Sequence, residues 1–414
     1  MKGKSMKISK DAQNAIRIAL LCSLTYLAVY FAKNILSAVS PQMIELGLVT
    51  EQQLGAFSST YFICYALGQL INGMIGDKIK ARYMICSGVI LAGVSIVTFL
   101  QMMDVPAVAR IAYGCTGFFL SMIFGPLTKL VAENTNPIHT PRCNLAYTFA
   151  AYLGSPTAGL LASLFVWKTV FSVGVGALLL MGTLCYILFL SYEKKGIIRY
   201  NQFAVKTQQK ERRSLAECVR ILLKHRIAKF ALVALITGVI RTTVVFWMPV
   251  YISQNLGFSA EHAATLFAIA SFVLSANAFV AVFVYERLKR NMERTILLAF
   301  SSATVFFLLV YSVKIPALNI IFLVLGVLSS NCASSMLWAR YCPSLRETGL
   351  VSSATGFLDF TSYMAASAAS NLFADAVSVI GWGNLILVWV GLMIAGVLIM
   401  FPFSSACTKD IAKD

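Results

Sequence analysis

Residues 16–41 read IRIALLCSLTYLAVYFAKNILSAVSP, a run in which Arg17 and Lys33 are the only charged side chains. An α-helix that crosses the hydrocarbon core of a bilayer needs ~20 predominantly apolar residues. Backbone N–H and C=O groups inside lipid can bond only with each other, so the run predicts a membrane-spanning α-helix. No small-residue cleavage pattern follows it, and we therefore expect no signal peptide.

Comparable apolar runs recur along the whole chain. Of its 414 residues, 58% are hydrophobic and 12% are charged, and the mean hydropathy is +0.78. This composition excludes a water-soluble protein, and we predict an all-α membrane protein with twelve transmembrane helices. The predicted spans are 16–41, 52–75, 83–103, 106–131, 144–165, 169–191, 228–254, 261–284, 295–313, 317–341, 350–373 and 382–403.

The basic residues indicate how the chain lies in its membrane. A net charge of +17 could indicate a nucleic-acid partner, but the lysines and arginines gather in alternate loops, and the opposite loops keep only Lys168 and Lys314. Loops on the cytoplasmic side of membrane proteins carry such an excess. We therefore expect a multi-pass protein of a bacterial cytoplasmic membrane, with both termini in the cytoplasm. We expect it to be monomeric in the lipid bilayer and to have no nucleic-acid partner.

One long polar break, the segment 193–226, divides six predicted spans from six. It holds ten lysines and arginines, which favour the anionic cytoplasmic face of a bilayer. Residues 214–224 predict a short amphipathic helix in that interface. The predicted domains are an N-terminal six-helix bundle at 1–192, a cytoplasmic linker at 193–226 and a C-terminal six-helix bundle at 227–414.

The two halves repeat each other at a fixed spacing. Lys33 precedes Pro41 by eight residues and Arg241 precedes Pro249 by eight, so both members of the pair are offset by 208. Internal repeats of this kind are typical of membrane transporters. The repeat predicts two pseudo-symmetric six-helix bundles, related by a two-fold axis along the membrane normal.

The loop after the second span reads GMIGDKIKAR, residues 73–82. This stretch resembles the signature of the major facilitator superfamily in the same place. The resemblance implies that fold and, for the charged residues of the loop, a role in the gate at the cytoplasmic side. An ordinary loop with cytoplasmic positive charge is the alternative. The gating residues expected from the resemblance are Asp77, Lys78 and Arg82, and the repeat adds Glu286 and Arg287 at an offset of 209.

Lys33 and Arg241 lie near the middle of their predicted spans. A charged side chain at the bilayer centre costs ~2.5–3.5 kcal/mol or more, so it persists mainly where water or a ligand meets it. Because the two residues occupy equivalent positions of the repeat, we expect them to face each other across a central cavity. Arginine binds phosphate or carboxylate through two parallel hydrogen bonds, and lysine adds a compact charge. The predicted partner is a small anionic substrate.

Around Lys33 the chain resembles a narrower family. The stretch YLAVYFAKN, residues 26–34, is similar to the first-helix signature of the organophosphate:phosphate antiporter family, the glycerol-3-phosphate and hexose-phosphate carriers. That family has arginine at the place of Lys33. The resemblance implies a phosphate site lined by tyrosines and basic residues, and exchange of a phosphate ester for phosphate. The predicted substrate-binding residues are Lys33, Arg241, Tyr26, Tyr30, Tyr65 and Gln69, the last of which stands where the family can have lysine.

Asp359 is the only acidic residue in the interior of a predicted span, since Glu261 stands at the first position of its span. Intramembrane acids usually mark a functional site. It is a candidate coupling residue, either as a partner for Arg241 or Lys33 in the empty carrier or as a proton site. The alternative is a salt bridge that only fixes helix packing.

The remaining patterns argue against other classes of protein. No two of the ten cysteines form a C-x-x-C pair and only three histidines occur, so we expect no metal site, no disulfide framework and no cofactor. No nucleophile–base pair suggests an enzyme. The sequence predicts a secondary active transporter of small organic anions that works by alternating access, with phosphate esters exchanged for phosphate. Two alternatives stay open: proton-coupled symport of an organic or sugar acid, and a transporter-like membrane sensor of an external anion.

Overall fold

The computed structural model describes residues 9–76, 79–136, 138–199, 215–345, 348 and 350–401, and the regular structure within these ranges is helical. The helices of the first half are α1 (Lys10–Glu45), α2 (Glu51–Gly76), α3 (Ala81–Gln101), α4 (Pro106–Ser121), α5 (Phe124–Asn134), α6 (Thr140–Tyr152), α7 (Gly154–Leu164) and α8 (Trp167–Lys194). Those that follow are α9 (Leu215–Lys224), α10 (Ile227–Gly238), η1 (Val239–Val244), α11 (Val245–Gln254), α12 (Ala260–Ser275), α13 (Asn277–Arg287), α14 (Met292–Ser312), α15 (Pro316–Met336), η2 (Leu337–Tyr341), α16 (Cys342–Ser344) and α17 (Val351–Met400).

These helices correspond to the twelve predicted spans. Ten stretches of the described chain are long and apolar enough to cross a membrane. One of them, α17, holds both the eleventh and the twelfth predicted span, because the chain turns at Gly381, where φ is +73°. The fifth predicted span corresponds to α6 and α7 together. The chain is thus an all-α, multi-pass membrane protein, as predicted, and the short helix predicted at 214–224 is present as α9.

The eleventh span is longer than predicted. Its predicted end was residue 373, whereas the helix continues to the turn at Gly381. Asp375 and Ser378 interrupt the apolar run beyond that point, but both are exposed at the end of the helix. An exposed helix end needs no apolar side chain, so hydropathy alone placed the boundary too early.

Two spans contain a π-helical turn that carries an arginine. In one span η1 holds Arg241 and precedes Pro249, and in the other η2 holds Arg340 and precedes Pro343. Proline lacks the N–H that a regular helix needs, and π turns occur where helical hydrogen bonding is irregular, often at functional sites. Arg241 therefore lies on an irregular turn in the middle of its span.

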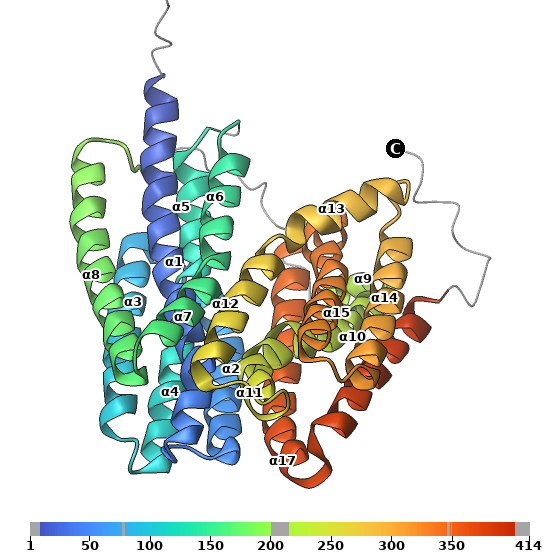
Figure 1. Cartoon of the computed structure of the whole chain (residues 1–414). Coiled ribbons are helices and arrows are strands. Elements are labelled where there is room, and N and C mark those ends of the chain that lie inside the picture. The colour runs from blue at the N-terminus through green and yellow to red at the C-terminus, as the bar shows by residue number, and fades with distance from the viewer. Residues whose placement is uncertain are drawn as a thin grey trace, which may run out of the picture.

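The helices form two groups that spread apart toward the end where the N-terminus lies, α1 to α8 in one and α9 to α17 in the other (Figure 1). At the opposite end the groups are in contact. The hydroxyl of Ser37 donates a hydrogen bond of 2.7 Å to the carbonyl of Phe246. The hydroxyls of Ser59 and Ser367 lie 3.0 Å apart, so α2 packs against α17.

Small residues allow the two groups to approach each other closely. A Cβ atom at Gly159 on α7 would lie 2.9 Å from the carbonyl oxygen of Ala264 and from Ala268, both on α12. A side chain at this position would have to push the two helices apart. Glycine at such a crossing is typical of tightly packed membrane helices.

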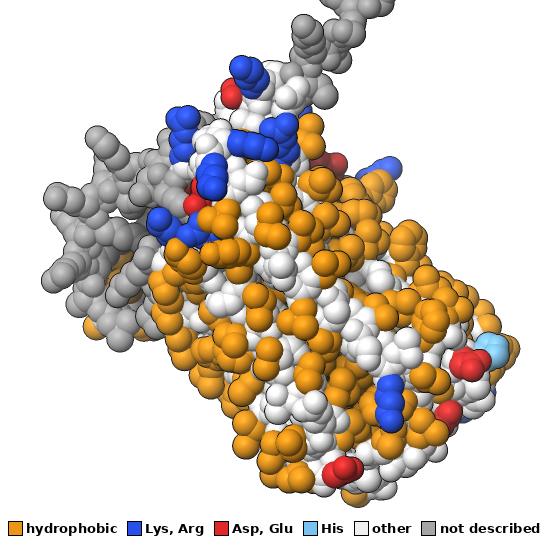
Figure 2. All heavy atoms as spheres, turned by 90° about the vertical axis from the view of Figure 1, so that its left-hand side faces the viewer, with side chains coloured by type: hydrophobic (Ala, Val, Ile, Leu, Met, Phe, Trp, Pro, Cys, Tyr) orange, Lys and Arg blue, Asp and Glu red, His pale blue; other side chains and the backbone are white. Residues whose placement is uncertain are grey.

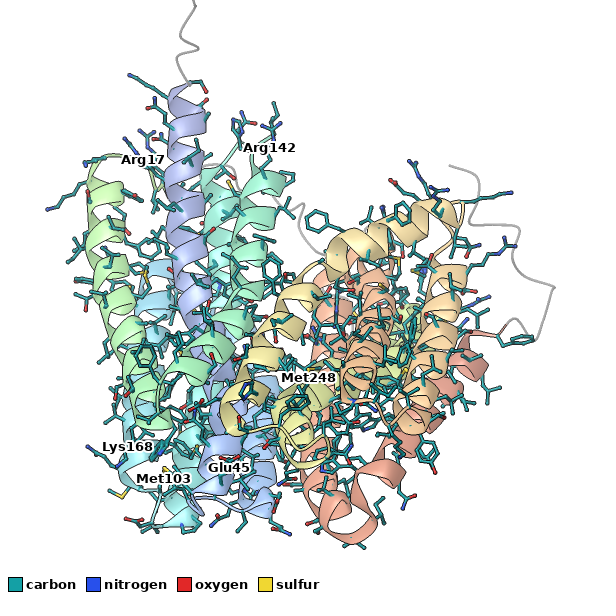
Figure 3. The ribbon with its side chains drawn as sticks, in the orientation of Figure 1. Arg17, Glu45, Met103, Arg142, Lys168 and Met248 are labelled. Atoms are coloured by element: carbon teal, nitrogen blue, oxygen red, sulfur yellow. The ribbon has the colours of Figure 1, made fainter. Side chains whose placement is uncertain are left out.

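The outer surface is apolar between two charged ends. Figure 2 shows hydrophobic side chains over one broad face and most of its lysines and arginines at the end near the N-terminus. Leu180 on α8 is 70% exposed and Leu20 on α1 is 59% exposed, as expected of side chains that lipid covers. Arg17 and Arg142 lie at the end near the N-terminus, and Lys168 lies at the opposite end (Figure 3).

Candidate functional site

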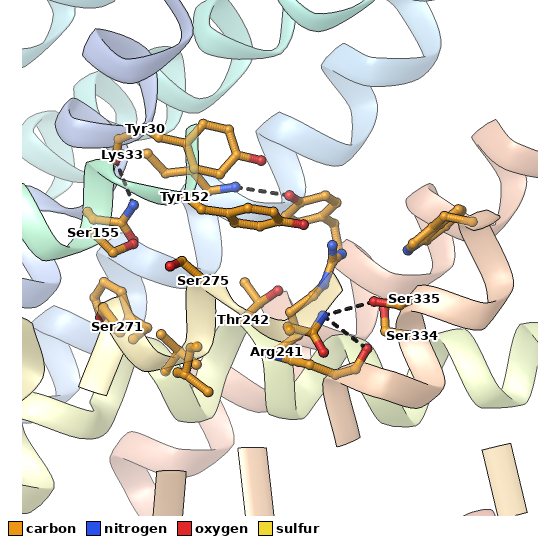
Figure 4. A pocket seen from close by; sticks show the side chains of 18 of the residues that line it. Tyr30, Lys33, Tyr152, Ser155, Arg241, Thr242, Ser271, Ser275, Ser334 and Ser335 are labelled. Atoms are coloured by element: carbon orange, nitrogen blue, oxygen red, sulfur yellow. Dashed lines mark hydrogen bonds between the residues drawn. The ribbon is translucent and has the colours of Figure 1, made fainter. Parts of the chain in front are cut away.

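A cavity of about 200 Å³ lies between the two groups of helices. Its lining includes Lys33 from α1 and Arg241 from η1, and none of the described residues that line it is acidic. Figure 4 shows both basic side chains extending into the same pocket from different helices. The cavity is smaller than the ~300–1,000 Å³ of pockets for drug-sized ligands, so it suits a small molecule.

Aromatic rings and one hydroxyl hold the ammonium of Lys33. Its Nζ donates a hydrogen bond of 2.9 Å to the hydroxyl of Tyr363 on α17. The same Nζ lies 4.5 Å from the centre of the Tyr65 ring, 4.9 Å from that of Tyr363 and 5.3 Å from that of Tyr30. Ring faces attract cations, and more strongly where water is excluded. Three rings thus compensate part of the cost of placing this charge away from bulk water.

Arg241 has only weak partners within the protein. Its guanidinium lies 3.3 Å from the hydroxyl of Ser362 and 4.0 Å from a carboxylate oxygen of Asp359. Its buried Nε has no hydrogen-bond partner in the described part of the chain. The guanidinium carbon lies 5.7 Å from the centre of the Tyr363 ring. The arginine therefore keeps hydrogen-bonding capacity for a ligand.

Tyr363 is the residue that both cations share, and sequence reasoning missed it. It is 5% exposed and lies one helical turn after Asp359 on α17. Its ring also packs against that of Tyr65, with centres 4.7 Å apart. The spacing of four residues from the one intramembrane acid was a signal for it, although tyrosines are common in apolar helices for packing alone.

The other predicted substrate residues lie at different distances from the cavity. Tyr30 lines it, and Tyr26 packs edge-on against Tyr30 with ring centres 4.9 Å apart. Tyr65 reaches the site through its ring under Lys33 and is not among the lining residues. Gln69 is half-buried, and neither it nor Asp359 lines the cavity.

The predicted gating residues fall into three groups. Arg82 on α3 forms an ion pair of 2.8 Å with Glu193 on α8, within the first half of the chain. Glu286 and Arg287 are exposed at the end of α13. Asp77 and Lys78 lie outside the described residues. A role of these five residues in a gate stays a prediction.

A second set of polar residues lines the cavity, and sequence reasoning missed it as well. We call it the polar wall, and its members are Ser271 and Ser275 on α12, Asn277 on α13, and Asn331, Ser334 and Ser335 on α15. Their spacings of three and four residues place them on one face of each helix. That spacing within apolar runs was the available signal, but small polar residues also serve helix packing.

Comparison with known proteins yields one family and several relatives. The sequence model of the Major Facilitator Superfamily matches residues 22–370. The glycerol-3-phosphate transporter of Bacillus subtilis (strain 168) is 22% identical over 253 residues, 57% of this chain and 57% of that protein. A probable hexose phosphate transport protein of Chlamydia trachomatis serovar D is 27% identical over 119 residues, 28% of this chain and 26% of that protein. The membrane sensor protein UhpC of Salmonella typhimurium is 28% identical over 76 residues, 18% of this chain and 17% of that protein. The chain thus spans at most 57% of the length of these three relatives.

Solved structures share the fold at low sequence identity. The D-xylose-proton symporter aligns with a TM-score of 0.72 and 13% identity, over 94% of this chain and 97% of that chain. A bacterial homolog of the human lysosomal transporter Spinster, in an inward-facing and unoccupied conformation, aligns with a TM-score of 0.68 and 14% identity, over 95% of each chain. At these identities the similarity concerns the fold alone.

Proposed function

The chain belongs to the Major Facilitator Superfamily, as the motif at 73–82 predicted, and from this premise we propose that it carries small organic anions across a bacterial cytoplasmic membrane. The observation that carries the proposal is the meeting of Lys33 and Arg241 at one cavity that no described acidic residue lines. Two cations that share a pocket repel each other. An anion held between them removes that repulsion and stabilises the occupied site.

The hydrogen-bond donors of the two cations favour phosphate or carboxylate. The unpartnered Nε of Arg241 is buried, and a buried donor without a partner is unfavourable. Two oxygens of one anionic group would accept from it and from a neighbouring guanidinium N–H in the bidentate geometry that arginine favours. Lys33 has three donors and uses one for Tyr363, which leaves others for the same anion.

Phosphate esters exchanged for phosphate are the proposed substrates. The resemblance of residues 26–34 to phosphate-ester carriers supports this class, as do relatives named as glycerol-3-phosphate and hexose phosphate transport proteins. The small size of the cavity is consistent with esters of this kind. An anion that neutralises Lys33 and Arg241 makes it easier for the occupied carrier than for the empty one to switch between its inward-facing and outward-facing conformations. This difference favours exchange over net flux.

The proposed mechanism is alternating access by two bundles, 1–192 and 227–414, that rock about the cavity. With both termini in the cytoplasm, as the loop charges indicate, the contacts between α2 and α17 and between α7 and α12 close the external side. The cavity would then load from the cytoplasm in this conformation. The charged residues predicted for the gate would meet at the cytoplasmic side in the opposite conformation.

Proton-coupled symport of an organic or sugar acid is the second candidate, and Asp359 favours it. Its carboxylate lies 4.0 Å from Arg241, close enough to respond to an anion bound there. If the carboxylate takes up a proton when the substrate binds, the two would move together. In the exchange mechanism the substrate instead displaces the carboxylate from Arg241.

The test is uptake by the purified protein in liposomes loaded with phosphate. We expect external phosphate and phosphate esters to exchange with the internal phosphate. Lys33→Gln and Arg241→Gln should each lower this exchange by about 30-fold or more, the effect of removing one member of a buried charged contact. Lys314→Gln, which removes an exposed lysine, is the matched control and should behave as the wild type.

Three outcomes would favour another function. Unchanged exchange in both Lys33→Gln and Arg241→Gln refutes the site. Uptake driven by a pH gradient, and not by internal phosphate, would favour symport. Binding of phosphate esters without any flux would favour the sensor.

A further inference from the structure

We infer that the polar wall is a subsite for the hydroxylated organic part of the substrate. This inference rests on the proposed function, since it assumes that an anionic group of the same molecule lies at Lys33 and Arg241. It adds a second recognition element, made by α12, α13 and α15, and it selects a polyol or sugar body over a plain alkyl one.

Two atoms of the polar wall lack partners. The hydroxyl oxygen of Ser271 and the side-chain oxygen of Asn331 are buried and have no hydrogen-bond partner within the described part of the chain. The two residues are 4% and 8% exposed, and both line the cavity. Buried polar groups in native proteins are almost always satisfied. Two unsatisfied groups at one cavity therefore indicate a ligand that completes their hydrogen bonds.

The wall is held in place by its own contacts. The side-chain amide of Asn277 donates to the hydroxyl of Ser335 at 2.8 Å and to the backbone carbonyl of Asn331 at 3.4 Å (Figure 4). These bonds fasten α13 to α15 beside the cavity. Asn277 thus fixes the positions of Asn331 and Ser335. The side-chain oxygens of Ser271 and Asn331 remain able to form hydrogen bonds with a ligand.

The unpartnered atoms of the polar wall indicate which ligand group can complete their hydrogen bonds. The oxygen of Asn331 only accepts hydrogen bonds, so it requires a donor, and a phosphate dianion offers only acceptors. A hydroxyl group both donates and accepts, which suits Asn331 and Ser271 alike. Water can fill these places in an open cavity, and a ligand that displaces it must supply the same hydrogen bonds.

An aromatic residue beside the wall suits the other surface of a sugar. Trp338 from η2 also lines the cavity. An indole presents a broad apolar face, and the carbon-bound hydrogens of a sugar ring or polyol chain form a matching apolar surface. The cavity thus combines two basic groups, a polar wall and an aromatic face, which together match a phosphorylated polyol.

The experiment compares pairs of esters that differ only in hydroxyl groups. Glycerol 3-phosphate is paired with n-propyl phosphate, and glucose 6-phosphate with cyclohexylmethyl phosphate, and inorganic phosphate serves as the reference. Binding is measured as ligand-dependent stabilisation of the purified protein, and transport as exchange in phosphate-loaded liposomes. For at least one pair we expect the hydroxylated ester to bind about tenfold tighter or more, since sites built for a hydroxyl reject analogues that lack it.

Ser271→Ala and Asn331→Leu test whether the polar wall causes the preference for the hydroxylated ester. Each should bring the ratio of affinities for the paired esters close to one, and should lower the affinity for the hydroxylated ester more than that for inorganic phosphate. Ser172→Ala and Asn384→Leu are matched controls, because both residues are exposed and neither lines the cavity. They should keep the wild-type discrimination.

Equal affinity of wild-type protein for the esters of both pairs overturns the inference and leaves the proposed function standing. A preference for the hydroxylated ester that is unchanged in both Ser271→Ala and Asn331→Leu also overturns the inference. Because the wild-type comparison needs no variant, the test stays decisive even if a substitution prevents folding. Failure of the proposed function has a different signature, since inorganic phosphate itself would then neither stabilise the protein nor exchange.

Discussion

Lys33 on α1 donates its hydrogen bond to Tyr363 on α17, 330 positions later in the chain, with 2.9 Å between nitrogen and oxygen. The bond joins the two groups of helices at the wall of the cavity. The same tyrosine ring lies 5.7 Å from the guanidinium carbon of Arg241. Tyr363, from the second half of the chain, thus contacts both Lys33 of the first half and Arg241 of the second.

Tyr363 offers the first prediction. Tyr363→Phe keeps the ring and removes the hydroxyl, so the apparent affinity for phosphate should fall about tenfold or more, since a hydrogen bond to a charged group contributes ~1.5–3 kcal/mol. Tyr363→Leu also removes the ring from both cations and should lower affinity by about tenfold more. Phosphate-dependent stabilisation of each purified variant measures the difference. Equal losses in the two variants would show that the ring contributes nothing.

The second prediction concerns the identity of the cation at position 33. Lys33→Arg keeps the charge and supplies a planar group that stacks on tyrosine rings. We expect exchange of phosphate to stay within about tenfold of the wild type, whereas Lys33→Met, which is similar in length but uncharged, should lose about 30-fold or more. The initial rate of exchange in liposomes measures both. Activity in Lys33→Met would mean that the charge is dispensable.

The third prediction separates the roles of Asp359. Asp359→Asn removes an anion that lies 4.0 Å from Arg241. Because both side chains are partly exposed, the gain in affinity for phosphate should be only about twofold to fivefold, and exchange should continue. Asp375→Asn, an exposed acid on the same helix, is the control. Loss of both exchange and uptake driven by a pH gradient would instead identify Asp359 as a proton-coupling residue.

The fourth prediction concerns the crossing of α7 and α12. Gly159→Val places side-chain atoms where even a Cβ would lie 2.9 Å from Ala264 and Ala268, and overpacking of this kind costs ~1–3 kcal/mol. The two groups of helices should therefore separate more often at the end where they are in contact. Cysteines introduced by Ser59→Cys and Ser367→Cys report this, because the hydroxyls they replace are 3.0 Å apart.

We expect the oxidised cysteine pair to cross-link readily in an otherwise wild-type chain and poorly when Gly159→Val is present. Gly176→Ala is the control, since a Cβ there meets no atom within 4 Å. Mass spectrometry of the linked peptides gives the yield. The same cross-linking yield for the cysteine pair alone, with Gly159→Val and with Gly176→Ala would contradict the proposal that Gly159 permits the close packing of α7 on α12.

The fifth prediction concerns stability. The side chain of Arg82 is only 9% exposed and pairs with Glu193 at 2.8 Å. Glu193→Gln leaves that buried charge with a weaker partner and should destabilise the protein by ~2 kcal/mol, less than a fully buried pair because Glu193 is partly exposed. Thermal unfolding in detergent measures the change. Lys194→Gln, at the exposed neighbouring position, should leave the Tm unchanged.

Hydropathy and the repeat together predicted most of the fold, because apolar runs of sufficient length leave helices as the stable form in lipid. The repeat also placed Lys33 and Arg241 at equivalent positions, and the two do line one cavity. The end of the eleventh span was placed too early, since helix ends outside the lipid carry no hydropathy signal. Tyr363 and the polar wall escaped notice because their significance depends on which faces of distant helices meet.

The contact between the two groups of helices has an energetic consequence. Two serine pairs lie in it, Ser58 with Ser370 and Ser59 with Ser367. Each hydrogen bond of this kind contributes only ~1 kcal/mol net, whereas binding of a millimolar ligand releases ~4 kcal/mol. Separating these two pairs therefore costs less free energy than such a ligand supplies on binding.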